Sequence, residues 1–349
     1  MRLRFRSFGI STFLAYREGN CRMKSSGIGG QAVIEGVMMQ NQDQYAVAVR
    51  KPDGEIEVAK DTWQSFTKKH KALNIPFVRG IFNFVDSMRL GMRILTFSAS
   101  FYEEEEQEKD EKAEKKESVI MSITMVVAVI LALGIFFVLP MFLSGLFRSF
   151  VSSRALMGFI EGLIRLAIFI GYVLLISLMK DIRRVFMYHG AEHKCINCVE
   201  HGLDLTVENV RKSSKQHKRC GTSFLLFVVF VSILFSMVIQ IDTVWLKALL
   251  RILLIPVIAG ISYEILKLAG RSDNWLINLI SKPGLLLQRL TTREPEDDMI
   301  EVAICSVEAV FDWRKYEAEA FGRKFSEESA VNQTVSEGKA AAEAGESES

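Results

Sequence analysis

The sequence lacks a marked excess of either charge, has few cysteines, and begins without an apolar segment of the secretory type. There are 43 basic and 41 acidic residues, so the composition gives no argument for nucleic-acid binding and we expect none. Five cysteines in 349 residues are too few, and odd in number, for a disulfide framework. Residues 1–26 are basic and lack an apolar core. We interpret them either as a leader or as the result of a mis-called start, with Met23 as the true first residue.

Apolar residues form 49% of the chain and charged residues 24%, which does not suit one uniform globule. Long apolar blocks alternate with charged ones, as in a membrane protein with water-exposed appendages. About 20 residues of helix cross a bilayer core of about 30 Å, and four blocks reach that length. They lie at 119–147, 156–179, 221–241 and 245–266. We therefore predict a mainly α membrane protein with about four transmembrane helices, a small N-terminal β-containing cytoplasmic domain and amphipathic helices.

The part before the membrane divides into three segments. Residues 27–73 form a small β domain, with strands expected at 33–39, 45–50 and 55–58. Residues 74–101 carry apolar positions at helical spacing and basic residues between them, which predicts an amphipathic interfacial helix. Residues 102–118 are a charged, solvated linker.

The membrane domain is predicted over 119–270, with a metal-site loop at 181–220, followed by a C-terminal cytoplasmic segment over 271–322. Residues 323–349 have little to bury, and we expect disorder there. Nine lysines and arginines lie between Lys180 and Arg219. The positive-inside bias therefore predicts a multi-pass cell-membrane protein with this loop and both termini in the cytoplasm.

The loop contains the pattern His189-x-x-Glu192-His193. Residues at i and i+4 share a helix face, so both imidazoles can bind one divalent ion, with zinc expected. Glu192 has the place of the general base in inverted zincins. A catalytic zinc also needs a third ligand and an open position. The candidates for that ligand are Glu200, His217 and Glu264.

A second pattern overlaps the first. Cys195-x2-Cys198 followed by His217-x2-Cys220 has the spacing of a closed structural zinc site. If the helix of the second span continues through this region, both cysteines of the first pair fall off the His/Glu face. We therefore favour an open site of His189, His193 and the His217–Cys220 arm, with Cys195 and Cys198 as small core residues. A closed Cys/His site and a loop without metal remain as alternatives.

One further pair lies inside the second span. Glu161 and Arg165 are four residues apart and can therefore form an ion pair on one helix face. Such a pair faces protein rather than lipid, and the simplest role for it is to lock helices together.

Six stretches of this sequence resemble the bacterial YqhQ-like family, a membrane protein family of unknown function (DUF1385) that is also described as a predicted metal-dependent enzyme. They are Gly29–Met39, Pro76–Gly80, Tyr188–Lys194, Arg219–Ser223, Ser262–Glu264 and Leu290–Pro295. The resemblance covers residues 27 to 310. It implies a multi-pass membrane protein and supports His189, Glu192, His193, His217 and Cys220 as site residues.

The leading hypothesis is a membrane-embedded, metal-dependent hydrolase with a cytoplasm-facing site. His189 and His193 are metal ligands, His217 or Cys220 completes the shell, and Glu192 is the general base. The lipid bilayer is the expected partner, with a lipid or a juxtamembrane peptide as substrate. The rival hypotheses are a non-enzymatic scaffold with a structural metal site and a small-solute or ion transporter. The reaction and the oligomeric state do not follow from the sequence.

Overall fold

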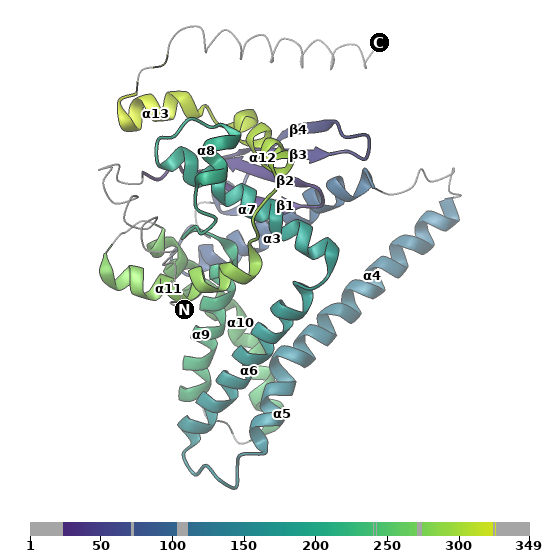
Figure 1. Cartoon of the computed structure of the whole chain (residues 1–349). Helices are drawn as coiled ribbons and strands as arrows, with labels where there is room; N and C mark the ends of the chain where they lie inside the picture. The colour runs from purple at the N-terminus through teal and green to yellow at the C-terminus, as the bar shows by residue number, and fades with distance from the viewer. Residues whose placement is uncertain are drawn as a thin grey trace, which may run out of the picture.

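The computed structural model describes residues 24–70, 73–102, 111–239, 241, 243–270, 274–323 and 325. Residues 1–23 of the predicted leader, 103–110 of the charged linker and nearly all of the C-terminal tail lie outside these residues. The described chain has two parts, a bundle of long apolar helices and a mixed unit around a sheet (Figure 1).

Four helical segments are long and apolar enough to cross a bilayer, as the sequence predicts. The first is continuous from α4 (Glu111–Leu133) through a π-helical turn (Gly134–Val138) into α5 (Leu139–Gly145). The others are α6 (Arg154–Ile176), α9 (Gly221–Val238) and α10 (Val244–Ala269). Helix α9 packs against both α6 and α10, whereas α4 leans away from the bundle toward its N-terminus (Figure 1).

The N-terminal sheet has four antiparallel strands in sequence order. They are β1 (Gly29–Val33), β2 (Gly36–Asn41), β3 (Gln44–Arg50) and β4 (Ile56–Thr62). The single strand predicted over 33–39 is wrong, because the chain turns at Ile34-Glu35 and pairs β1 with β2. Glu35 has a φ of 49°, a left-handed conformation that only a tight turn imposes on such a residue.

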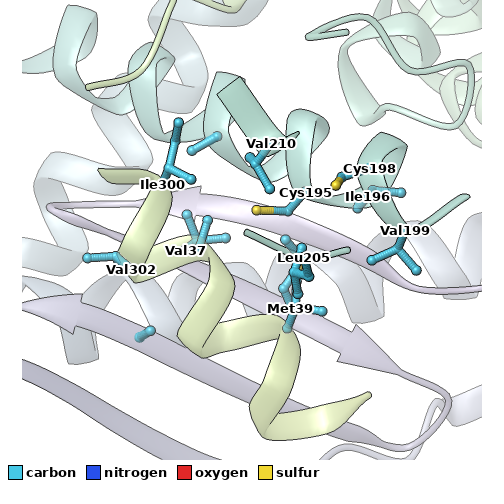
Figure 2. Close-up of a cluster of buried hydrophobic side chains, with 14 of the residues drawn as sticks. Val37, Met39, Cys195, Ile196, Cys198, Val199, Leu205, Val210, Ile300 and Val302 are labelled. Atoms are coloured by element: carbon cyan, nitrogen blue, oxygen red, sulfur yellow. The ribbon is translucent and has the colours of Figure 1, made fainter. Parts of the chain in front are cut away.

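Both faces of the two central strands are covered, so β2 and β3 have buried side chains at successive positions, whereas β4 is mostly exposed. One face packs Val37, Met39 and Ala48 against α7 (Lys180–Glu200) and α12 (Asp297–Val310). Figure 2 shows this cluster, with side chains of α7, α8 and α12 meeting those of β2. The other face packs Val33 and Val47 on Leu90 and Ile94 of α3 (Val78–Ser100).

Two amphipathic helices lie at the junction between the bundle and the sheet unit (Figure 1). Helix α3 contacts α10, and α11 (Trp275–Thr291) packs on α9. Each leaves apolar side chains exposed: Val85, Met88 and Met92 on α3, and Trp275, Leu279 and Leu286 on α11. This exposed stripe on α3 is the surface that an interfacial helix would use.

Helix α7 is separate from α6, so the prediction of one continuous helix through His189 is wrong. Helix α6 ends at Ile176, and Met179 at the start of α7 has an extended backbone (ψ 134°). The reason lies in composition. The first turn of α7 carries Lys180 and Asp181, with Arg183 and Arg184 close behind, and four such charges are costly in a bilayer. The chain therefore turns where the apolar run ends.

The remaining helices close the mixed unit. They are the short α2 (Phe66–Lys69), α8 (Val207–Lys212) beside α7, and α13 (Trp313–Phe321), which follows α12 after a break at Phe311-Asp312. Helix α12, from the last part of the described chain, thus packs on the N-terminal sheet.

Candidate metal centre

Helix α7 has two faces with different tasks. Its apolar face holds Cys195 and Cys198 in the core beside Val37 and Ile300 (Figure 2). Both cysteines are free thiols and fully buried. The other face bears His189, Glu192 and His193, whose spacing of i, i+3 and i+4 aligns them on one side of the helix. The helix phase therefore separates the histidines from the cysteine pair, as the sequence predicts.

Cys220 reaches this face from a distant segment. It is the N-cap residue of α9, and its sulfur accepts a hydrogen bond from the backbone N–H of Thr222 at 3.4 Å. The cap fixes the side chain in place, because the cysteine is tied to the first turn of a long packed helix. The Sγ atom lies 3.3 Å from Nε2 of His189.

Each histidine is oriented by a backbone carbonyl. Nδ1 of His189 lies 2.9 Å from the carbonyl oxygen of Thr291, and Nδ1 of His193 lies 2.7 Å from that of Lys215. A carbonyl oxygen only accepts, so Nδ1 carries the proton in both rings. In the neutral imidazole the Nε2 lone pair is then free to bind a cation, as in most metal-ligating histidines.

Three potential ligand atoms converge here, one each from His189, His193 and Cys220. All lie within 4.8 Å of one another. Zinc bonds of about 2.0–2.1 Å to nitrogen and 2.3 Å to sulfur put tetrahedral ligand atoms about 3.3–3.7 Å apart. The three side chains therefore fit a single zinc ion after small rotations, and they leave a fourth position open.

Glu192 lies beside the group without belonging to it. Its carboxylate is 3.9 Å from Nε2 of His189 and is buried. Burial raises the pKa of this carboxyl, while the two imidazoles and the backbone N–H of Gly30 oppose the rise. A Cβ at position 30 would come within 2.8 Å of the Glu192 side chain, so a glycine is required for this approach.

The thiol and the imidazoles polarise one another. Burial alone would raise the pKa of Cys220, but the neighbouring His189 and His193 lower it well below its ordinary value. Burial alone would lower the pKa of His189, and Cys220 instead raises it to about 9. The pair thus favours a thiolate beside an imidazolium. The thiolate is the form of cysteine that binds metal, and a metal at this place would displace the Nε2 proton of His189.

His217 lies apart from the three ligand atoms. Its Nε2 is 3.3 Å from Glu200, and its backbone is held by Gln288 through two hydrogen bonds of 2.9 and 2.7 Å. Burial lowers the pKa of His217. Glu200 is fully buried and also binds Ser26 and Arg219. This network anchors the arm that carries Cys220.

Glu264, another candidate for the third ligand, does not reach the histidines. Glu264 on α10 forms a two-pronged ion pair with Arg79 of α3, with Nε to Oε1 at 2.6 Å. This pair joins the bundle to the helix beneath the sheet, and it does not bring Glu264 to the histidines.

A cavity of about 460 Å³ opens beside the histidines. Its wall comes from β1, α3, α7 and the first turn of α9, including Gln31, Ser87, Phe186 and Thr222. These elements meet where the apolar bundle joins the sheet unit, so the cavity lies at the boundary of the predicted membrane. It is partly apolar, through Ile28 and Leu90 among others.

Sequence reasoning missed the groups that orient the site. The carbonyls of Thr291 and Lys215 and the amide of Gln288 are 102, 22 and 71 residues from their histidine partners. A backbone carbonyl has no signature in sequence, and nothing in the spacing marks Gln288. Gly30 lies in a stretch that carries the family resemblance, which is the one signal that pointed to it.

The chain is similar in sequence to proteins of unknown function. The family model for "Protein of unknown function (DUF1385)" matches residues 75–313. The "Uncharacterized protein YqhQ" of Bacillus subtilis (strain 168) is 39% identical over 284 residues, covering 79% of this chain and 89% of that protein. No solved structure matches the chain significantly. The chain therefore belongs to the DUF1385 family of proteins of unknown function.

Proposed function

We propose that this protein is a multi-pass membrane hydrolase that uses one divalent metal ion, zinc, held by His189, His193 and Cys220. The observation that carries the proposal is the paired orientation of the two histidines. Each has Nδ1 committed to a backbone carbonyl and Nε2 available near the Cys220 sulfur. Two independent carbonyl contacts to rings on one helix face are the arrangement that metal-binding histidines need. His217 serves this site by holding the ligand arm.

The residues divide the chemistry among them. When bound, a zinc ion acts as a Lewis acid and lowers the pKa of water to about 7. Glu192 lies next to the open position, and its buried carboxylate has few other partners, so it is suited to accept and return a proton. Gly30 allows the close approach of this side chain, because a Cβ at position 30 would come within 2.8 Å of it.

The cavity indicates the class of substrate. Its walls combine polar groups such as Gln31 and Gln40 with apolar ones, and α3 and α11 leave apolar side chains exposed at the same level. A lipid headgroup or a juxtamembrane peptide would present polar and apolar parts together at this depth. The basic loop before α9 supports an orientation with the site and both termini in the cytoplasm.

Metal analysis of full-length protein tests the proposal. Protein purified in mild detergent should contain about one zinc per chain, as a three-ligand site predicts. Cys220→Ala and His189→Ala should each lose most of the metal and keep the helix content. Cys195→Ala is the matched control, because it removes another buried thiol outside the ligand group, and it should retain the metal. Folded wild-type protein that binds no zinc, as isolated or after zinc addition, would refute the site.

A second measurement separates catalysis from a structural metal. Glu192→Gln keeps the shape of the side chain but removes the base, so the metal should stay while the variant behaves like a deletion strain in the cell. A Glu192→Gln strain indistinguishable from wild type would instead favour the scaffold hypothesis, in which the metal only holds α7 and α9 together.

A further inference from the structure

A second charged cluster lies inside the helix bundle, far from the histidines. Glu161 of α6 is fully buried and pairs with Arg165 at 3.2 Å, as the sequence predicts. Lys247 and Arg251 of α10 also bind this carboxylate, with Lys247 Nζ at 2.9 Å. Three cations against one carboxylate leave a formal excess of two positive charges among the described residues.

Besides Glu161, Arg165 has two neutral partners. Its Nη1 donates to Ser232 of α9 at 2.9 Å, and its Nε donates to the carbonyl of Phe136 at 3.0 Å. Phe136 lies in the π-helical turn of the first span. Such turns displace the regular hydrogen bonds of a helix and occur frequently at functional sites. The first span thus supplies a carbonyl group to this cation, which shares the single Glu161 carboxylate with Lys247 and Arg251.

Two cavities adjoin this cluster, and Lys247 lines both. The smaller, of about 20 Å³, is bordered by Arg165 and Arg251. The larger, of about 250 Å³, lies between the α5–α6 connection and the start of α10. Its described lining includes Arg148, Arg154 and Lys247 and contains no acidic residue. This end of the bundle points away from the sheet (Figure 1).

The start of α6 adds to the positive potential of the larger cavity. Ser152, Ser153 and Arg154 line it, and Ser153 is the N-cap residue of this 23-residue helix. The N-terminus of a long helix carries about half a positive charge. Arginine and lysine side chains together with such an N-terminus are the groups that bind phosphate.

Of the cluster, only Lys247 lines the larger cavity, where Arg148, Arg154 and the N-terminus of α6 add positive charge. These groups together favour a bound anion. We propose that the larger cavity is a binding site for a phosphate group, contacted by Arg148 and Lys247 at the end of the bundle opposite the histidines. The phosphate is that of an anionic lipid headgroup or a free phosphate ion, which share this chemistry. The site is distinct from the candidate metal centre, so neither proposal depends on the other.

The test uses full-length protein in phosphatidylcholine nanodiscs. One arm measures binding of radiolabelled inorganic phosphate. The other adds phosphatidylglycerol and counts retained lipids by native mass spectrometry. Arg148→Gln and Lys247→Gln should each weaken binding about tenfold or more, the effect of losing one charge-assisted hydrogen bond. Arg183→Gln is the matched control, because Arg183 is an exposed arginine at the opposite end of the bundle, and it should bind normally.

Phosphate binding alone would identify a small anion as the ligand, and retention of phosphatidylglycerol alone would identify a lipid; either supports the site. Absence of both in the wild type would overturn it. Equal loss in Arg183→Gln and Arg148→Gln would overturn it as well, because general surface charge would then explain the binding. Arg148 lies on an exposed connection, so its variant is expected to fold even if Lys247→Gln does not.

Discussion

Glu200→Gln should reveal how strongly the charged network under the ligand arm stabilises the protein. Burial alone would raise the pKa of Glu200, but His217 and Arg219 lower it from 4.5 to about 2. A difference of this size corresponds to about 3 kcal/mol of stability from the ionised carboxylate. Glutamine keeps the side-chain shape and loses the charge, so the variant should unfold about 3 kcal/mol more easily at pH 7.

The pH dependence has a definite sign. A carboxyl whose pKa is lower in the folded state stabilises it fully above its unfolded pKa, here about pH 4.5. The contribution then falls as the pH drops toward 2, and about 1.4 kcal/mol of it remains at pH 3. The gap between wild type and Glu200→Gln should therefore be constant from pH 7 to 5 and shrink by more than half at pH 3.

Equilibrium unfolding in mixed micelles, followed by circular dichroism at each pH, measures this gap. Glu57→Gln is the control, because Glu57 is exposed on β4 and should change stability by less than about 0.5 kcal/mol. A Glu200→Gln variant as stable as Glu57→Gln at pH 7 would refute the reasoning. So would a gap that does not change between pH 5 and pH 3.

Two further substitutions test packing around the site. In Gly190→Ala the new Cβ would lie 2.0 Å from the carbonyl oxygen of Arg293, so thermal denaturation should show a loss of stability of about 1–3 kcal/mol or more. Gly171→Ala is the control, because nothing lies within 4 Å of a Cβ there, and its stability should be unchanged. Equal effects of the two substitutions would contradict the contact. Ile300→Ala leaves a cavity at a fully buried position between α12 and the sheet. The same assay should show a loss of stability of about 2–5 kcal/mol. A loss below about 1 kcal/mol would mean that α12 does not pack tightly on the sheet.

Much of the architecture follows from the sequence because its signals are local. The four apolar runs and the β-rich region near the N-terminus are each encoded in contiguous stretches. The separation of Cys195 and Cys198 from the histidine face also follows, because the phase of a helix depends only on spacing. The same holds for the Glu161–Arg165 pair.

Local sequence patterns do not predict features that depend on contacts between distant segments. The sequence alone does not reveal that the chain turns at Glu35 or that α7 starts afresh after α6. In both places the choice depends on pairing and on the membrane boundary. Nor does it distinguish His217 from Cys220 as the partner of His189. Buried Glu200 holds His217 away, and the N-cap position of α9 brings Cys220 within 3.3 Å.

The sequence by itself thus determined the helix face that carries His189, Glu192 and His193, because that face is a property of one continuous segment. Tertiary structure decided which side chain meets the face, because Cys220 arrives from a different helix. It also decided the orientation of the rings, through carbonyls of Thr291 and Lys215 that no residue type encodes. Long-range packing, rather than composition, therefore brings His189, His193 and Cys220 together.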